Sequence, residues 1–181
     1  MADTIENTFI AISGPQLYVR YTKSSTQSET VTLVLSPFAE EMNKSRHLSC
    51  QLMNSLLLHG HDSFFHDPWG TGDSEADLDV ASATIWQQHL VLIIEHLKTH
   101  GYRRLNIVAS RYGSLQLFDL LSTIELPLQL DKIVLWQPYL QTTTFLQQFL
   151  RLKIAEQMAK GTKTSQKELE RQLAEGEIVE V

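Results

Sequence analysis

The residues with the clearest chemical meaning form a short segment, Ala109-Ser110-Arg111-Tyr112-Gly113, which follows an apolar run. Small residues at both ends, Ala109 and Gly113, are typical of a tight turn in which a strand passes directly into a helix. In a Gly-x-Ser-x-Gly turn of this kind the central residue is a nucleophilic serine, whereas here it is Arg111. A guanidinium keeps its proton at physiological pH and offers only hydrogen-bond donors, so Arg111 cannot attack a carbonyl carbon.

A cation at this position favours a bound anion. Arg111 would lie at the start of a helix, beside backbone N–H groups such as that of Tyr112, and both features attract negative charge. One interpretation is that Arg111 and the turn hold a carboxylate, a phosphate or an acidic side chain of the protein. The other is that Arg111 pairs with Glu40 or Glu41 and simply completes the fold. The sequence leaves both interpretations open.

Two serines next to the turn are weak candidates for a nucleophile. Ser110 lies one place too early, and Ser114 falls inside the start of the helix. Either serine would need a histidine within hydrogen-bond reach. In the usual chain order that histidine follows the nucleophile, but none of the seven histidines comes after His100. The residues therefore predict no conventional catalytic triad, with Ser110 as the weak candidate that remains.

Three segments should meet at one edge of the predicted sheet. In an open sheet of parallel strands, ligands bind at the carboxyl ends of the strands. Segments 36–39, 67–74 and 109–113 each follow a predicted strand. We therefore expect Phe38 and Ala39 to help bind the ligand of the third segment.

Charged residues come directly after the first of these segments. The run Glu40-Glu41 is followed by Lys44 and Arg46, and such a run is usually a solvated loop. Because it lies beside the predicted binding edge, we assign Glu40 and Glu41 a supporting role there.

Other polar groupings give weaker signals. The sequence Gly70-Thr71-Gly72 lacks both a phosphate-binding lysine and the full dinucleotide fingerprint, so no nucleotide or other cofactor is expected. Three histidines and two aspartates cluster before and within the strand expected at 62–66: His59, His61, Asp62, His66 and Asp67. They lack the helical or paired spacing of metal ligands, so we interpret them as a polar turn before a strand rather than a metal site.

The elements that must position these residues alternate along the chain. Gly14 and Pro15 predict a tight turn between two alternating strands, which form a hairpin. Continuous apolar runs then predict strands buried on both faces. We expect strands at about 8–12, 16–21, 31–35, 62–66, 105–109 and 132–136, with helices at 44–58, 80–99 and from the turn at 110–113 to about 123. This order favours an α/β fold with a mostly parallel sheet and helices on both faces.

The C-terminal part has a different pattern. Helices are expected at about 145–160 and 164–174, and nothing after them restores the alternation of strand and helix. We therefore divide the chain into a core at 1–140 and a helical segment at 141–181.

Composition excludes several classes of protein. A formal net charge of −6 argues against a nucleic-acid-binding protein, which usually presents a basic face. The single cysteine, Cys50, cannot form an intramolecular disulfide, which fits a reducing compartment. The N-terminus does not read as a signal peptide, and no apolar stretch approaches the roughly 20 residues that span a bilayer. A cytoplasmic protein without a membrane span is expected.

Several motifs are similar to one known family. Segment 37–46, Pro-Phe-Ala-Glu-Glu-Met-Asn-Lys-Ser-Arg, resembles the opening motif of exosortase A system-associated hydrolase 2, an α/β-hydrolase family. Gly70-Thr71-Gly72-Asp73-Ser74 is similar to its Gly-x-Gly-Asp-Ser loop. Arg111-Tyr112-Gly113 resembles its arginine-containing turn, although Ala109 stands where a glycine is common. Segments 135–138 and 145–152 continue the resemblance, which runs from about Pro37 to Met158.

The resemblance implies an α/β-hydrolase-like three-layer sandwich with an N-terminal hairpin, of which this chain would hold the core without its last strands. The helices at 141–181 would begin a cap, and the exposed sheet edge would make the chain poorly soluble. It also implies a bacterial hydrolase of an ester or acyl group, encoded with exopolysaccharide and exosortase functions. Its substrate would be a small molecule or a carrier-linked group, and its protein partners would belong to that system. A non-catalytic module that binds an anion or supports assembly is the alternative, because fold does not establish chemistry.

Overall fold

The computed structural model describes residues 2–161 and 164–175. The chain divides into two compact units, Met1–Pro138 and Tyr139–Val181. The first unit holds the sheet and the helices that cover it, and the described residues of the second unit form two helices.

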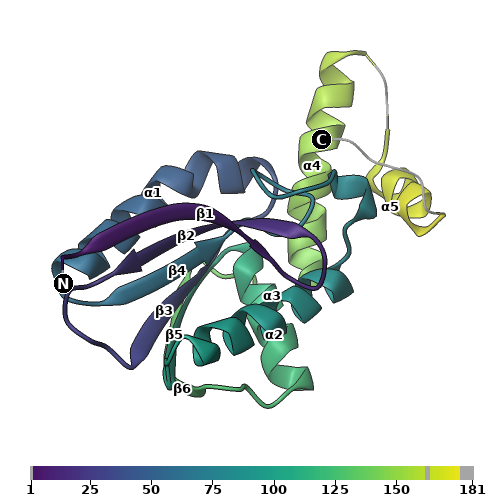
Figure 1. Cartoon of the computed structure of the whole chain (residues 1–181). Helices are drawn as coiled ribbons and strands as arrows, with labels where there is room; N and C mark the ends of the chain where they lie inside the picture. The colour runs from purple at the N-terminus through teal and green to yellow at the C-terminus, as the bar shows by residue number, and fades with distance from the viewer. Residues whose placement is uncertain (1, 162–163, 176–181) are drawn as a thin grey trace. The chain divides into compact units, whose positions relative to one another are not determined.

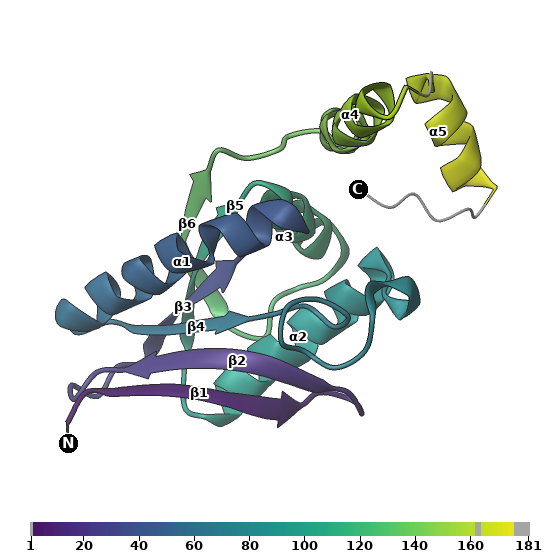
Figure 2. The same ribbon diagram turned by 90° about the horizontal axis from the view of Figure 1, so that it is seen from above.

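The first unit is built on a mixed sheet of six strands in the order β1-β2-β4-β3-β5-β6 (Figures 1 and 2). β1 and β2 form an antiparallel hairpin, and β2 pairs antiparallel with β4. The remaining pairs, β4 with β3, β3 with β5 and β5 with β6, are parallel. The strands are β1 (Thr4–Ala11), β2 (Gln16–Lys23), β3 (Thr30–Leu35), β4 (Asp62–His66), β5 (Arg104–Ser110) and β6 (Gln129–Trp136).

Helices cover both faces of this sheet (Figure 1). On one face, α2 (Ala83–Thr99) and α3 (Tyr112–Thr123) pack together over the main core, which includes Leu33 and Ile107 of the central strands. On the other face, α1 (Glu40–Leu58) buries Met53 against Val34 and Phe65. Leu33 and Val34 point to opposite faces because side chains alternate along a strand. The predicted three-layer α/β architecture is confirmed.

The predicted element boundaries differ from the structure mainly at helix starts. The strand expected at 62–66 is confirmed as it stands, and the others are longer than expected by one to three residues. The helix expected from Lys44 begins four residues earlier, at Glu40, so the interpretation of Glu40 and Glu41 as a solvated loop is wrong. The helix expected from Val80 begins at Ala83, after a short 3₁₀ turn at Leu78–Val80. Ser82 caps that helix, because its side chain accepts a hydrogen bond from the Ile85 N–H.

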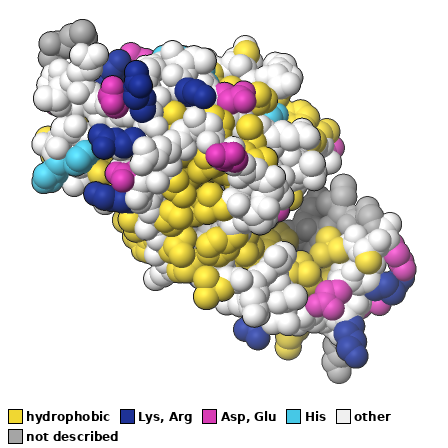
Figure 3. Space-filling view, turned by 90° about the horizontal axis from the view of Figure 1, so that it is seen from below, with side chains coloured by type: hydrophobic (Ala, Val, Ile, Leu, Met, Phe, Trp, Pro, Cys, Tyr) yellow, Lys and Arg dark blue, Asp and Glu magenta, His cyan; other side chains and the backbone are white. Residues whose placement is uncertain are grey.

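The edge strand β6 is apolar and exposed on both of its faces. Ile133 and Leu135 alternate with Val134 and Trp136, and all four side chains are between 38% and 53% exposed. Figure 3, seen from below, shows a broad gathering of apolar side chains on that side of the molecule. Parallel strands normally have such a sequence only where both faces are covered. β6 therefore has the sequence of an interior strand at the position of an edge.

The second unit contains α4 (Thr142–Ala159) and α5 (Gln166–Ala174), which pack against each other. Among the described residues of this unit, the buried hydrophobic side chains are Tyr139, Leu150 and Leu169. Tyr139 precedes α4, and its hydroxyl donates a hydrogen bond to Gln148 Oε1 in that helix at 2.7 Å. None of the helices in the described ranges is long and apolar enough to cross a membrane.

Candidate functional site

The turn between β5 and α3 has an unusual backbone conformation at its tip. Arg111 is the N-cap of α3, with φ 52° and ψ −118°, a region that residues other than glycine rarely occupy. Its N–H donates to the Trp136 carbonyl of the neighbouring strand at 3.1 Å, which ties the tip to the sheet. The predicted sequence of strand, bend and helix is therefore present, with Arg111 at the tip.

The small residue Gly113 is required by the close approach of α3 to β3. A Cβ atom at Gly113 would lie 2.6 Å from the Leu35 carbonyl oxygen and 2.9 Å from that of Ser36. Since both contacts are to backbone, the neighbouring atoms cannot rotate away. Gly113 thus allows the first turn of α3 to pack directly on the end of β3.

A second turn of the same shape lies beside the first. Ala39, the N-cap of α1, has φ 52° and ψ −129°, close to the values at Arg111. The strands that lead into the two turns are parallel neighbours, with Leu35 of β3 paired to Ala109 of β5. Two helix N-termini therefore begin side by side at the carboxyl edge of the sheet, as predicted for segments 36–39 and 109–113.

Arg111 binds a carboxylate from the neighbouring helix. Its Nη2 donates to Glu41 Oε1 at 2.7 Å, and its Nε lies 3.2 Å from each oxygen of the same carboxylate. The Arg111 side chain is 28% exposed and that of Glu41 is 43% exposed. An internal acid is thus present at the guanidinium, and solvent still reaches both partners.

Glu40 points elsewhere. Its carboxylate pairs with Lys44 one turn along α1 at 3.2 Å, and both side chains are mostly exposed. Such a pair on a solvated helix surface contributes little to stability. Of the two glutamates that were predicted to support the site, the structure brings Glu41 to Arg111 and leaves Glu40 on the surface.

Three aromatic rings lie close to one another beside the two turns. Phe38 lies 5.4 Å from the Tyr112 ring and 5.7 Å from the Trp86 ring, and Trp86 and Tyr112 are 6.0 Å apart. Trp86 is anchored by its indole N–H, which donates to the Trp69 carbonyl at 2.8 Å. Burial raises the pKa of the Tyr112 hydroxyl above its ordinary value. The structure therefore brings the predicted Phe38 and Tyr112 together and adds Trp86, which sequence reasoning missed.

The two candidate serines are held by backbone carbonyls. The Ser110 hydroxyl donates to the Leu35 carbonyl at 3.1 Å, and the Ser114 hydroxyl donates to the Arg111 carbonyl at 2.6 Å. Ser114 is fully buried. Within the described ranges, Ser110 has no hydrogen bond to a histidine, so nothing there activates it as a nucleophile.

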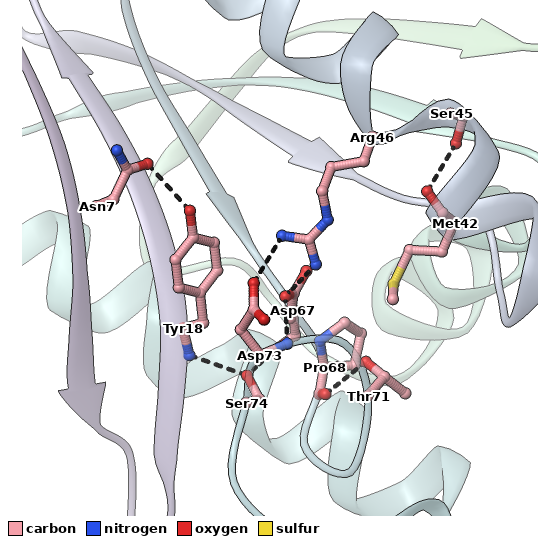
Figure 4. A network of polar contacts seen from close by, with 10 residues as sticks. All are labelled: Asn7, Tyr18, Met42, Ser45, Arg46, Asp67, Pro68, Thr71, Asp73 and Ser74. Carbon is pink, nitrogen blue, oxygen red and sulfur yellow. Dashed lines mark hydrogen bonds and ion pairs between the residues drawn. The ribbon is translucent and has the colours of Figure 1, made fainter.

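A second polar network, absent from the sequence predictions, lies between α1 and the loop after β4 (Figure 4). Arg46 pairs with Asp67 and with Asp73, the latter at 3.2 Å. Its guanidinium also stacks over the rings of Tyr18 and Phe65, at 5.5 and 5.8 Å from their centroids. The contacts link residues 21 and 27 positions apart in the chain, so no local pattern could have identified them.

Asp67 is the buried centre of this network. Its side chain has no exposed surface, and it accepts a hydrogen bond from the Asp73 N–H at 2.9 Å. Burial raises the pKa of its carboxyl, while the Asp73 N–H and the Arg46 guanidinium act in the opposite direction. Next to the network is an open cavity of about 440 Å³, lined by Ala39, Met42, Asn43, Arg46, Gly70, Thr71, Gly72, Asp73 and Leu78.

The polar residues around β4 do not converge on a shared point. Asp62 accepts a hydrogen bond from the Tyr102 hydroxyl at 2.6 Å, and the His59 ring bonds to the Ser55 carbonyl. His66 is buried, whereas His61 is exposed. In the portion that the structure describes, no three histidine, cysteine or acidic side chains gather as a metal site would require.

Comparison with known proteins identifies the fold. No protein-family model and no curated protein sequence matches the chain. Among solved structures, a putative hydrolase from Agrobacterium vitis S4 matches 76% of this chain and 53% of its own, with 14% identity and a TM-score of 0.59. An esterase from Exiguobacterium antarcticum matches 86% of this chain and 59% of its own, with 19% identity and a TM-score of 0.60. A variant of potato epoxide hydrolase matches 73% of this chain and 39% of its own, with 19% identity and a TM-score of 0.56.

The chain thus spans about half the length of the first two of these proteins. At these identities the likeness concerns the fold and not the reaction. The order of the strands, the bend that begins α3 and these three likenesses together show that the described part of the chain has the α/β-hydrolase fold.

Proposed function

We propose that this chain is an acid-binding module on the α/β-hydrolase fold, in which Arg111 occupies the nucleophile position and holds a carboxylate or phosphate of its ligand. The observation that carries the proposal is that the tip of the bend presents a cation, and that this cation already binds a carboxylate, that of Glu41. Arg111 holds a backbone conformation that costs about 1–3 kcal/mol. Such strain is concentrated at binding and catalytic sites, which supports a role for this side chain beyond packing.

In this proposal the Glu41 carboxylate binds Arg111 in the absence of ligand, and an external acid displaces it. Both partners are partly exposed, and ion pairs of this kind contribute about 0.2–1 kcal/mol. Displacement of Glu41 therefore weakens binding of an external acid by at most about fivefold. The displaced carboxylate can return to water, because Glu41 lies in the first turn of α1.

The neighbouring rings favour an acid with an apolar or aromatic body. Phe38 and Tyr112 flank the bend and are only partly buried, so they offer apolar surface next to the cation. Burial of about 60 Å² of ligand surface at about 25 cal/mol/Å² would strengthen binding about tenfold. We therefore expect benzoate to bind more tightly than acetate.

The biological setting in this proposal comes from the resemblance of segment 37–46 and of the later motifs. It associates the chain with a bacterial exosortase and exopolysaccharide system. A small-molecule or carrier-linked acid would then be the ligand, and proteins of that system the partners.

Binding of simple acids tests the proposal. Acetate, benzoate and inorganic phosphate are titrated by calorimetry into the wild-type chain, into Arg111→Gln and into Arg104→Gln. Arg104 is an exposed arginine at the start of β5 and serves as the matched control. The proposal predicts saturable binding that Arg111→Gln abolishes and Arg104→Gln retains. Equal binding by the wild type and Arg111→Gln, or no binding to either, would contradict it.

A second candidate function is hydrolysis of an ester or acyl group. It is favoured by the fold shared with an esterase and by the position of Ser110 directly before the tip of the bend. Hydrolysis of short p-nitrophenyl esters by the wild type, lost in Ser110→Ala, would support this function over the acid-binding module. The acid-binding proposal predicts no turnover above the rate in buffer.

A further inference from the structure

Two histidines lie at the C-terminal end of α2, His96 in its last turn and His100 at its C-cap. His96 and His100 are four residues apart, and their ring centroids are 4.2 Å apart with an angle of 41° between the planes. Side chains at this spacing are neighbours on a helix, and pairs of histidines at i and i+4 are a recurrent way to hold a zinc ion. We propose that His96 and His100 form a two-histidine clamp for a divalent transition-metal cation such as Ni²⁺ or Zn²⁺, with water completing its coordination.

The hydrogen bonds of His100 leave the correct nitrogen available. Its Nδ1 lies 2.8 Å from the His96 carbonyl oxygen. Because a carbonyl can only accept, Nδ1 carries the proton, and the lone pair of the neutral ring is therefore on Nε2. Metal-binding histidines usually have this arrangement, in which a backbone carbonyl fixes the ring and its tautomer.

The surroundings of His96 also suit a ligand. Its ring packs 6.4 Å from that of Phe64 on β4, which restricts its orientation, and it remains partly exposed. The carbonyl end of α2 adds a partial negative charge that favours a cation at this position.

The chain offers a matched control for this pair. His59 closes α1, and its Nδ1 lies 2.8 Å from the Ser55 carbonyl, which is the same local arrangement as at His100. However, the residue one turn before His59 is Ser55 and not a second histidine. His59 therefore has the fixed tautomer without the clamp.

The test measures metal binding by untagged protein at neutral pH. NiCl₂, ZnCl₂ and MgCl₂ are titrated by calorimetry into the wild type, His96→Gln, His100→Gln and His59→Gln. We expect one Ni²⁺ or Zn²⁺ per chain and no Mg²⁺, which prefers oxygen ligands. His96→Gln and His100→Gln should each weaken binding by at least about tenfold, whereas His59→Gln should leave it unchanged.

Thermal unfolding gives a second readout that does not depend on heat of binding. Ni²⁺ should raise the Tm of the wild type and of His59→Gln, but not of the two clamp variants. Because the rings lie near the surface, both variants should fold, and their Tm without metal checks this. Equal binding by all variants, or loss of binding in His59→Gln, would show an adventitious ion only. Either result would overturn the proposal.

Discussion

At the scale of single residues, two arginine–carboxylate pairs at the same edge of the sheet differ in their surroundings. Asp67 is fully buried beside Arg46, so loss of Arg46 would leave the Asp67 carboxylate inside the protein without its cation. Glu41 and Arg111 are both reached by solvent, and their pair can open at little cost. The first pair therefore holds the loop after β4 in place, whereas the second suits exchange with a ligand.

The buried histidine at the end of β4 should make stability depend on pH. Burial, and then the nearby His89, lower the pKa of His66 from 6.5 to about 4, and its Nδ1 has no hydrogen-bond partner in the described ranges. Between about pH 6.5 and pH 4 the unfolded chain binds a proton that the folded chain does not. The free energy of unfolding should therefore fall as the pH is lowered through this window, by up to about 3 kcal/mol.

Urea unfolding at several pH values checks this expectation. His66→Gln should reduce the slope of stability against pH between pH 6.5 and 4, even if it lowers stability at pH 7. The exposed His61→Gln provides the control and should keep the wild-type slope. An unchanged slope in His66→Gln would show that another group controls acid stability.

At the scale of elements, the bend between β5 and α3 depends on the packing of Gly113 against β3. Gly113 has no positive φ, so a substitution there causes no backbone strain of that kind. Gly113→Ala should lower the free energy of unfolding by about 1–3 kcal/mol, because its Cβ would overlap the backbone of Leu35 and Ser36. Ser122→Ala, on the exposed side of α3, should change stability by no more than about 0.5 kcal/mol. Chemical denaturation of both variants measures the difference, and equal stability would mean that α3 can move away from β3.

The sequence predicted the order of the elements well because each strand has a continuous or alternating apolar pattern. It predicted the start of α1 wrongly for a physical reason. Ala39 caps that helix without a side-chain hydrogen bond, so the usual Ser, Thr, Asp or Asn signal is absent. Similarly, the acidic run Glu40-Glu41 is compatible with a loop until its place in the first turn of the helix is known.

The candidate site was predictable only in part. The position of Arg111 followed from the small residues around the turn, since close packing of a strand and a helix leaves a local signature. The choice between Glu40 and Glu41 depended on the rotation of α1, which the sequence does not specify. The contacts of Trp86 and of Arg46 join residues from separate elements, so they depend on the tertiary fold.

At the scale of the whole molecule, the exposed edge of the sheet should control association. The outer edge of β6 pairs with no strand in the described ranges, and its side chains from Ile133 to Trp136 are apolar and exposed. Such edges promote pairing between chains, and a lysine on the edge opposes it. The 181-residue chain should therefore associate in a concentration-dependent way, and Val134→Lys should reduce this association.

Sedimentation velocity over a range of concentrations measures the effect. Leu58→Lys is the matched control, because Leu58 is an exposed apolar residue, 84% accessible, at the end of α1 and away from the sheet edge. It should leave the association unchanged. A wild-type chain that remains monomeric, or an equal effect of the two lysines, would exclude the edge as the cause.

Arg111 is proposed to be an acid-binding group, to which Glu41 binds until a ligand replaces it. The most direct test is the affinity of Glu41→Gln for benzoate, compared with the wild type under the same conditions. If Glu41 competes with the ligand, its removal should strengthen binding by up to about fivefold. Weaker binding or none in a folded Glu41→Gln variant would contradict the account, because Glu41 would then be part of the site's structure and not its exchangeable occupant.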